Sequence, residues 1–187
     1  MKQILLIRHG KTEANLRHLY HGSTDLPLCP EGIRELGEKG KLPEGDWRFL
    51  TSGMKRTEET LALLFGPVAH ETDPRFRELD FGVFEMKSYE ELKDDPSYQA
   101  WISGDNEKNI APGGESGEMM TARVLEAFRD LEKREGDWVL VSHGGTISAI
   151  MASLFPEEGK NRYQWQSPCG GGYLLKKTDA GWRYEIM

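Results

Sequence analysis

The sequence predicts an α/β protein, a three-layer sandwich in which helices flank a mostly parallel central sheet. Short aliphatic runs, typical of strands buried on both faces, alternate along the chain with segments that repeat apolar residues at helical spacing. Two of these runs also end alike, in a histidine followed by a glycine at residues 9–10 and 143–144. Parallel strands that end in this way bring their reactive groups to one sheet edge, where open α/β sheets bind their ligands.

Composition limits the class of protein. A length of 187 residues supports a single domain over residues 1–187. The formal charge of −7 argues against nucleic acid or a membrane surface as the main partner. Two distant cysteines, Cys29 and Cys169, predict neither a disulfide framework nor a zinc site. No apolar run approaches the ~20 residues of a membrane span, and Lys2 leads directly into a strand. We therefore expect a cytoplasmic protein without a signal peptide.

The chain is organised around its first strand and the residues directly after it. This strand is expected over residues 4–7, and it stops at Arg8, His9 and Gly10. Gly10 lets the backbone turn tightly or approach a ligand closely. Thr12 is placed to cap the helix that follows, whose N-terminal amides would favour an anion.

The other elements follow from periodicity and from turn residues. Further strands are predicted over residues 47–52, 68–72, 138–142, 172–176 and 182–186. Helices are predicted over residues 13–18, 31–39, 54–65, 89–102 (interrupted near Pro96), 118–134 and 146–155. Loops connect them over residues 20–30, 73–88 and 103–117, and the density of charge and aromatic residues in the second predicts an ordered functional loop. The two C-terminal strands are expected to pair antiparallel at the edge of the sheet.

Three predicted strands deliver cations and imidazoles to the same edge. The first ends at Arg8 and His9, and the strand over residues 138–142 ends at His143. The strand over residues 47–52 is followed by Arg56 in the first turn of its helix. One arginine side chain can bind two phosphate oxygens at once, and the backbone amides at a helix N-terminus add oriented donors. This set suits phosphoryl transfer, in which neutralising and positioning the phosphoryl oxygens supplies most of the catalysis.

Four segments in order resemble the signature segments of the histidine phosphatase superfamily, which has the phosphoglycerate-mutase-like fold. The resemblance extends from Lys2 to about Ala152, and its segments are Arg8-His9-Gly10 with Thr12, Glu13 and Asn15, then residues 52–60, 77–85 and 142–145. Two departures are visible. Lys11 stands where many relatives carry glutamate, which adds a cation at the mouth of the pocket. Residues 84–87 replace the more usual tryptophan-glutamate-glycine run, so packing behind the acidic segment is expected to differ.

The resemblance implies a phosphohistidine mechanism. His9 would attack phosphorus as the nucleophile, and Glu78 would protonate the leaving oxygen and then take a proton from water. Arg8, Arg56 and His143 would hold the phosphoryl oxygens. No metal or other cofactor is expected, because the arginines supply the electrostatic stabilisation. Further contacts with the phosphate ester are expected from Asn15, Thr24, Lys11 and the amide of Gly144.

Other polar residues have simpler interpretations. His18 and His21 are spaced like a metal-binding pair, but without a third ligand nearby both are better explained as exposed loop histidines, as is His70. Arg17 is equally well a surface charge or a contact at the mouth of the phosphate site. Glu85 is expected to act through structural hydrogen bonds rather than as a second acid. The five tryptophans are expected in the core and at its boundary.

Three functions fit the predicted fold: a small-molecule phosphomonoesterase, a phosphoglycerate mutase, and a non-catalytic phosphate-binding module. The complete set of catalytic residues argues against the third. Residues 87–117 are shorter than the insertion that covers the site in the mutases, which favours a site open to water and hence hydrolysis. Residues 20–28 and 112–116 look most like α-ribazole phosphatases, although fructose-2,6-bisphosphatase-like and broad-specificity phosphatases share similar segments. We expect a small phosphate ester as substrate and a monomer or homodimer.

Overall fold

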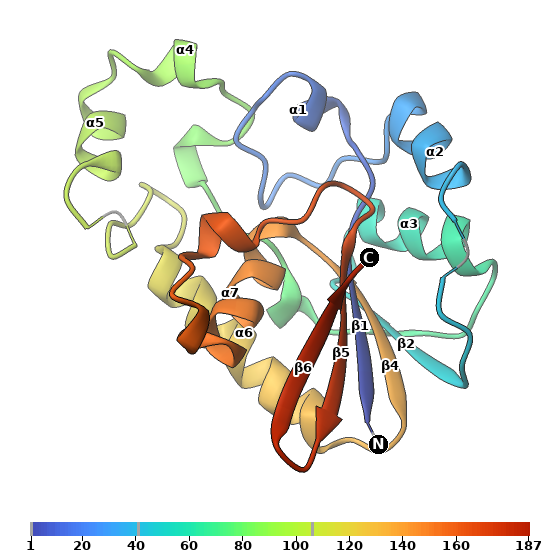
Figure 1. The fold of residues 1–187 in the computed structure, drawn as a ribbon. Coiled ribbons are helices and arrows are strands. Elements are labelled where there is room, and N and C mark those ends of the chain that lie inside the picture. Colours follow the sequence, from blue (N-terminus) through green and yellow to red (C-terminus); the bar gives the residue numbers. More distant parts are fainter. Residues whose placement is uncertain (1, 41, 106) are drawn as a thin grey trace.

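A six-stranded mixed sheet forms the centre of the computed structural model, which describes residues 2–40, 42–105 and 107–187 (Figure 1). The strand order is β3-β2-β4-β1-β5-β6. Strands β3, β2, β4 and β1 pair in parallel, whereas β5 is antiparallel to both β1 and β6. The strands are β1 (Gln3–Arg8), β2 (Trp47–Thr51), β3 (Glu71–Thr72), β4 (Asp137–Ser142), β5 (Gly172–Thr178) and β6 (Gly181–Ile186). The predicted mostly parallel sheet, with its antiparallel C-terminal strands, is confirmed.

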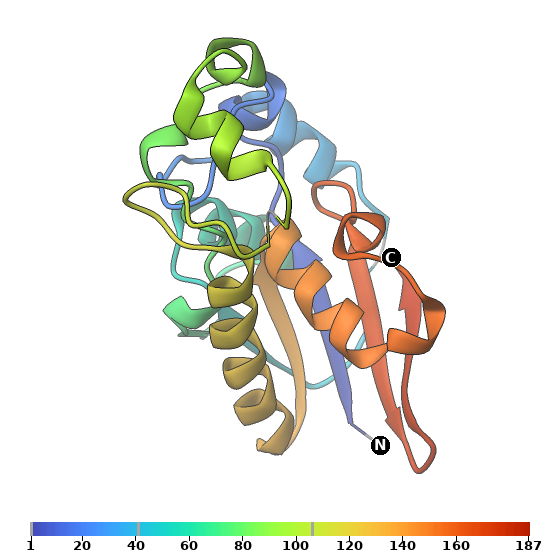
Figure 2. The ribbon, with the colours of Figure 1, turned by 90° about the vertical axis from the view of Figure 1, so that its left-hand side faces the viewer.

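Helices cover both faces of this sheet. On one face, α6 and α7 pack against a core that includes Ile4 and Leu6 of β1 (Figure 2). On the other face, Leu61 of α3 joins Leu5 and Ile7 in a second core cluster. Strand β1 is therefore buried on both sides, as its aliphatic run predicted. The helices are α1 (Glu13–Leu16), α2 (Pro30–Gly37), α3 (Lys55–Phe65), α4 (Tyr89–Leu92), α5 (Pro96–Ile102), α6 (Gly117–Lys133) and α7 (Gly144–Leu154).

Differences from the predicted boundaries have local causes. The first helix ends at Leu16, because His18 adopts a φ of 53°, outside the right-handed helical region. The predicted strand over residues 68–72 forms only at Glu71–Thr72. The predicted interruption near Pro96 is confirmed, since α4 ends at Leu92 and Asp95 caps a new helix that begins with Pro96.

The segment between β3 and α6 forms a layer above the carboxyl ends of the strands (Figure 1). Phe84 and Tyr98 are fully buried there and pack around Trp101, with ring centroids 5.3 and 5.8 Å from its ring. Met86 stands where the resembled family usually has glycine. It adopts a φ of 60°, a left-handed conformation that glycine adopts without steric cost. The loop over residues 103–117 completes this layer, and Asn106 lies outside the described residues.

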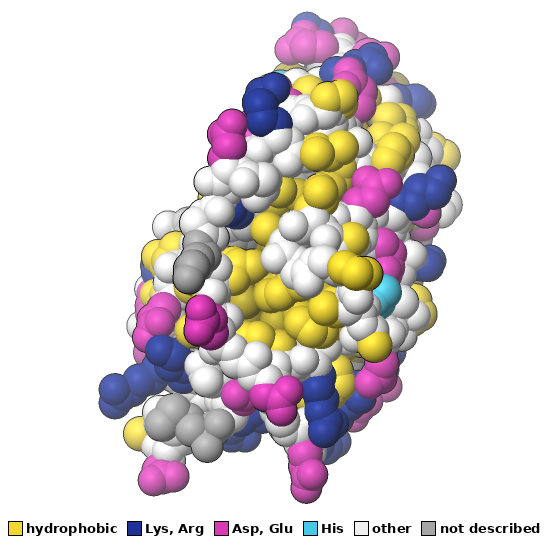
Figure 3. Space-filling model, turned by 90° about the vertical axis from the view of Figure 1, so that its right-hand side faces the viewer, with side chains coloured by type: hydrophobic (Ala, Val, Ile, Leu, Met, Phe, Trp, Pro, Cys, Tyr) yellow, Lys and Arg dark blue, Asp and Glu magenta, His cyan; other side chains and the backbone are white. Residues whose placement is uncertain are grey.

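On the opposite side of the molecule, an apolar surface remains open beside α3 (Figure 3). It borders a hollow of about 650 Å³ lined by, among others, Leu42, Trp47, Phe49 and Phe65. The two cysteines are free, and the tryptophans lie in the core or at its boundary, as predicted for the tryptophans. In the described part of the chain, no helix combines the length and the apolar composition needed to cross a bilayer.

Candidate active site

His9 lies directly after β1 and is almost completely buried. Its Nδ1 is 2.7 Å from the carbonyl oxygen of Gly10. A carbonyl oxygen can only accept a hydrogen bond, so Nδ1 carries the proton and Nε2 of the neutral ring carries the lone pair. Burial first, and then the charge of Arg56, lower the pKa of His9 well below its usual value. The ring is therefore neutral at pH 7, with an unprotonated Nε2.

His143, the residue after β4, has the complementary pattern of hydrogen bonds. Its ring centroid is 5.2 Å from that of His9, so the two strand ends meet as the sequence predicted. Nδ1 accepts from Nε of Arg56 at 3.3 Å, and Nε2 lies 2.8 Å from Oγ of Ser52. Because arginine can only donate, Nδ1 of the neutral imidazole is unprotonated. The proton therefore resides on Nε2, and this N–H donates a hydrogen bond to Oγ of Ser52. Burial followed by Arg56 also lowers the pKa of His143 well below its usual value.

Arg56 is the buried cation between these elements. It occupies the first turn of α3, as predicted, and has no exposed surface. Its Nη2 donates to the carbonyl of Gly22 at 2.7 Å, and its Nη1 donates to that of Thr24 at 2.9 Å. Burial lowers its pKa to about 10, which leaves the guanidinium charged at pH 7. The loop over residues 20–25 thus fixes the direction of this side chain.

Glu85 in turn holds that loop. Its carboxylate accepts from the backbone N–H groups of Gly22 and Ser23, both at 2.9 Å, and from that of Phe81 at 3.1 Å. It also accepts the hydroxyl of Thr24 at 2.7 Å. The structural role expected for Glu85 is confirmed, and Thr24 joins the site through its carbonyl rather than its hydroxyl.

Arg8 approaches the same place from the end of β1. Its Nη1 donates to the carbonyl of Ser167 at 2.7 Å. Its Nε is buried and has no hydrogen-bond partner among the described residues. A Cβ on Gly144 would lie 3.1 Å from the guanidinium carbon, so the first residue of α7 is close to this cation. A buried N–H without a partner is unfavourable, and an anionic oxygen would satisfy it.

Glu78 lies in the segment after η1 (Pro74–Phe76), beside the first turn of α7. Its Oε2 accepts from the backbone N–H of Gly145 at 2.9 Å, and its Oε1 accepts from that of Leu79 at 2.9 Å. A Cβ on Gly145 would lie 2.3 Å from Oε1, so a side chain there would displace the carboxylate. The second glycine after His143 is therefore required by the position of Glu78, a role that sequence reasoning did not assign.

Lys11 and Asn15, both predicted to contact the phosphate ester, bind other residues of the chain. The ammonium group of Lys11, expected as a cation at the mouth of the pocket, instead binds Glu31 and Glu35 of α2, both at 2.7 Å. Its charge is thus balanced at the surface. Asn15 accepts the backbone N–H of Thr12 at 2.9 Å, and together they form a capping box at the start of α1. The predicted cap by Thr12 is confirmed.

His21 was expected to be an exposed loop histidine, and this is wrong. Its Nε2 donates to the carbonyl of Thr24 at 2.9 Å and lies 3.2 Å from Nη1 of Arg56. Burial, followed by the charge of Arg56, lowers the pKa of His21 to about 4. His18, by contrast, is exposed as expected. No group of three possible metal ligands occurs within residues 2–40, 42–105 and 107–187.

A cavity of about 280 Å³ opens beside Glu78 and Gly145, which form part of its wall. Aromatic side chains dominate the rest of the wall, which includes Tyr20, Phe81, Trp101 and Tyr163. Arg162 also lines it, and its Nε donates to Glu107 at 2.8 Å. The site therefore has a cationic end, where Arg8 and Arg56 lie near the two neutral histidines, and an aromatic end beyond Glu78.

Comparison with known proteins agrees with this geometry. The family model for the histidine phosphatase superfamily (branch 1) matches residues 4–187. An adenosylcobalamin/α-ribazole phosphatase of Salmonella typhimurium is 32% identical over 164 residues, covering 81% of this chain and 79% of that protein. A probable phosphoglycerate mutase of Enterobacter sp. is 30% identical over 162 residues, covering 82% of this chain and 75% of that protein.

Solved structures share the fold over nearly the whole chain. A protein from Escherichia coli K-12, provisionally assigned as an α-ribazole-5'-P phosphatase, has a TM-score of 0.85 at 24% identity and covers 100% of this chain and 95% of its own. A phosphoglycerate mutase from Thermus thermophilus has a TM-score of 0.71 at 29% identity, with 99% and 96% covered. At 24% identity, the similarity to the Escherichia coli protein shows the fold alone.

Proposed function

Because the chain belongs to the histidine phosphatase superfamily (branch 1), we propose that it is a metal-independent phosphomonoesterase acting through a phosphohistidine intermediate. The observation that carries this proposal is the state of His9, which is buried, neutral and unprotonated at Nε2 beside buried Arg56 and His143. A neutral imidazole nitrogen is a nucleophile, and the neighbouring cations would attract a phosphate dianion to it.

In the first step, Nε2 of His9 forms a bond to phosphorus while the bond from phosphorus to the leaving oxygen breaks. The N–H at Nδ1 continues to donate to the carbonyl of Gly10, which stabilises the positive charge that develops on the ring. Arg8 and Arg56 hold the phosphoryl oxygens, with further donors from the amide of Gly144 and from the Nε2–H of His143, which changes its acceptor from Oγ of Ser52 to a phosphoryl oxygen. Since the two guanidinium groups balance the phosphoryl charge, the reaction needs no divalent ion.

Glu78 completes this step as the general acid. Its carboxyl proton passes to the leaving oxygen, which then departs as an alcohol rather than an alkoxide. In the second step, the resulting carboxylate takes a proton from water as the water oxygen attacks phosphorus. The bond between phosphorus and Nε2 breaks, which releases inorganic phosphate and restores both His9 and the protonated Glu78. The anchoring of this side chain by Gly145 and Leu79 supports the assignment.

The substrate we propose is an ester with a flat aromatic ring near its phosphate, with α-ribazole-5'-phosphate as the leading example. Support comes from the cavity beyond Glu78, where Tyr20, Trp101 and Tyr163 offer ring faces and edges. The name of the Salmonella relative points in the same direction.

A phosphoglycerate mutase remains the second candidate, because the Enterobacter and Thermus relatives carry that name. Its substrates bear a carboxylate as well as phosphate, so the leaving-group end would need cations. Arg162 is the cation in the described wall of the cavity, and its bond to Glu107 already balances its charge. This wall favours an aromatic group over a second anion.

The proposal is tested by trapping the intermediate. Rapid acid-free quenching after mixing with α-ribazole-5'-phosphate labelled on phosphorus should leave label in a base-stable, acid-labile bond. His9→Ala should abolish both the label and turnover, whereas His70→Ala, at an exposed histidine, should keep both. Chelation of divalent ions should leave the rate unchanged. Label that survives in His9→Ala refutes the nucleophile, and efficient interconversion of phosphoglycerates with little phosphate release favours the mutase.

A further inference from the structure

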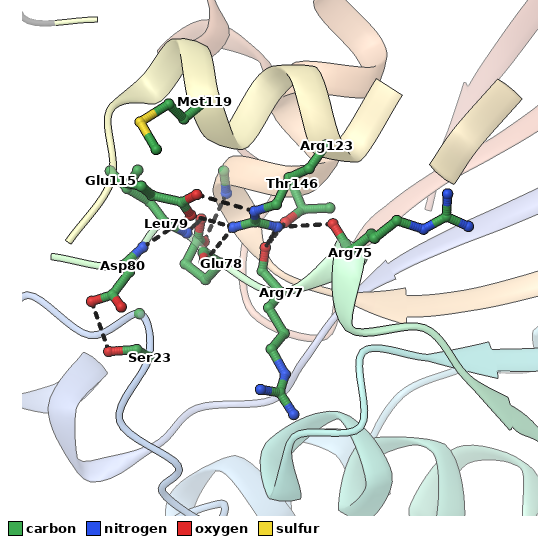
Figure 4. A network of polar contacts seen from close by, with 12 residues as sticks. Ser23, Arg75, Arg77, Glu78, Leu79, Asp80, Glu115, Met119, Arg123 and Thr146 are labelled. Carbon is green, nitrogen blue, oxygen red and sulfur yellow. Dashed lines mark hydrogen bonds and ion pairs between the residues drawn. The ribbon is translucent and has the colours of Figure 1, made fainter. Parts of the chain in front are cut away.

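Arg123 belongs to α6, outside the groups that would contact phosphate, yet its guanidinium reaches the backbone that carries Glu78 (Figure 4). Nη1 donates to the carbonyls of Arg75 at 2.8 Å and Arg77 at 2.7 Å, and Nη2 donates to that of Glu78 at 2.9 Å. The remaining N–H groups bind Glu115, with Nε at 3.2 Å from Oε2 and Nη2 on Oε1. Every one of the five donors of this guanidinium is used.

The segment that Arg123 holds has no regular secondary structure to fix it. After η1 the chain runs through Arg77, Glu78 and Leu79 without helix or strand geometry. Its carbonyls therefore depend on side chains from other elements. The carbonyl of Phe76, for example, accepts from Oγ of Ser142 at 2.7 Å. Contacts of this kind decide where an irregular segment lies, because the chain itself provides no ladder of hydrogen bonds.

One peptide group connects Arg123 to the carboxylate of Glu78. Within the peptide between Glu78 and Leu79, the carbonyl oxygen accepts from Arg123, and the N–H donates to Oε1 of Glu78 at 2.9 Å. The peptide is planar, so fixing the direction of its carbonyl also fixes the direction of its N–H. Rotation of this peptide would turn away the donor that orients the carboxylate.

Glu115 binds the backbone of Asp80 and also holds the guanidinium of Arg123 in place. Its backbone N–H donates to the carbonyl of Asp80 at 3.0 Å, and its Oε1 accepts the N–H of Asp80 at 3.2 Å. Three-quarters of the Arg123 side chain is shielded from water, since its exposed fraction is 25%, and that of Glu115 is 14%. Hydrogen bonds shielded in this way are stronger than exposed ones, which suits a rigid support.

We propose that Arg123, held by Glu115, is a positioning residue that aims the carboxyl group of Glu78 at the leaving oxygen. The inference rests on the proposed role of Glu78 as proton donor. It assigns to Arg123 a function that a lysine cannot fulfil, because an ammonium group has three donors and lacks the planar fork of a guanidinium.

The test exploits the leaving group. The leaving group of phenethyl phosphate is a strongly basic alkoxide, so its departure depends on a proton. The leaving group of para-nitrophenyl phosphate is a stabilised phenolate, which depends on a proton much less. Single-turnover phosphorylation of His9 isolates the step in which Glu78 acts as acid. Glu78→Gln should slow phosphorylation by phenethyl phosphate about 100-fold, the lower end of general acid catalysis, and should affect the nitrophenyl ester much less. Arg123→Met should show the same selectivity with a loss of about 10-fold.

Three further variants separate positioning from a general loss of structure. Arg123→Lys keeps the charge and should show the same selective loss, to a smaller extent. In the Glu78→Gln background, Arg123→Met should cause no additional loss for phenethyl phosphate, because Arg123 acts only through the proton that Glu78 donates. Arg75→Met is the matched control, since this arginine also joins the segment to α6, through Asp130 at 3.0 Å, without bonding the backbone of Glu78. It should affect both esters equally and little.

Each outcome is decisive. The selective loss in Arg123→Met or Arg123→Lys, absent from the Glu78→Gln background, supports the inference. An equal loss for both esters, or an additive loss in the double variant, overturns it and makes Arg123 a structural residue. If Glu78→Gln itself shows no difference between the esters, the proposed proton donor is wrong and the inference falls with it. Arg123→Lys decides the question should Arg123→Met fail to fold.

Discussion

The two ends of the site, the one proposed to bind phosphate (the phosphate end) and the one proposed to bind the leaving group (the leaving-group end), are built from different parts of the chain. At the phosphate end, His9 and His143 directly follow neighbouring parallel strands, and Arg56 lies in the first turn of the helix after a third. All three side chains are buried. At the leaving-group end, Tyr20 and Tyr163 come from irregular segments or short turns, and Tyr163 is 57% exposed. Sheet register fixes the first end, while loop packing fixes the second.

This difference teaches how chemistry and selectivity can be separated in one molecule. A change in a loop side chain at the aromatic end leaves the strand ends, and hence the two histidines, where they are. A change at the phosphate end disturbs buried groups that share partners, such as Arg56, which binds His143 and two loop carbonyls. Substitutions at the two ends should therefore differ in size and in the kinetic constant affected.

The largest effect is expected from Arg56→Lys. Lysine keeps the charge but cannot bond His143, the carbonyl of Gly22 and that of Thr24 at the same time. The rate of phosphorylation should fall about 1,000-fold, the scale on which arginines stabilise phosphoryl transfer. The loss should be equal for phenethyl and para-nitrophenyl phosphate, since charge on the phosphoryl group arises with both. Arg34→Lys on α2 is the control, and a selective loss with one ester would contradict the assignment to the phosphate end.

A smaller effect, on binding alone, is expected at the aromatic end. Tyr163→Ala should raise KM for α-ribazole-5'-phosphate about 10-fold, within the range measured for ring stacking on a base. KM for a small aliphatic phosphate should stay constant, and so should kcat for both. Tyr89 is the matched control because it is similarly exposed, at 53%, but lies outside the cavity wall. If Tyr163→Ala and Tyr89→Ala behave alike, the aromatic end does not select the substrate.

The smallest effect concerns the stability of the phosphate end at low pH. Burial lowers the pKa of His21 to about 4, so the folded protein does not bind a proton there at pH 5.5, while the unfolded chain does. Protons bound preferentially by the unfolded state destabilise the fold as the pH falls. Between pH 6.5 and 5.5, His21 should account for a loss of about 1 kcal/mol in the free energy of unfolding.

Chemical denaturation at the two pH values measures this loss. His21→Gln should reduce the difference in unfolding free energy between pH 6.5 and 5.5 by that amount, and His18→Gln, at an exposed position, should not. Because His9 and His143 have lowered pKa values as well, the wild-type protein should lose more than the share of His21 alone. An unchanged pH dependence in His21→Gln would show that this histidine is solvated.

The parts of the site that the sequence predicted share one property: they depend on neighbours along the chain. A run of aliphatic residues before His9 is sufficient to make a buried strand, and the same pattern places His143. Arg56 follows from its distance to the end of a strand. The cap by Thr12 follows from its place directly before a helix, and its partner in the structure, Asn15, is only three residues away.

The residues that the sequence placed wrongly, or did not single out, take partners from distant parts of the chain. Lys11 pairs with Glu31 and Glu35, so the cation expected at the pocket is neutralised on the surface. His21 becomes half-buried only because Arg56 and its own loop close around it. No local pattern indicates such partners, since each depends on how helices and loops pack.

By itself, the sequence determined the α/β fold, the order of its elements and the two histidines that meet at the sheet edge. These features follow from the chemistry of short segments, because the spacing of apolar residues and the residues that end a strand can be recognised in the sequence. The tertiary structure decided how Glu78 is held and that Arg123 supports it from α6. Hydrogen bonds in these cases join residues up to 67 positions apart, so their geometry exists only after the chain has folded.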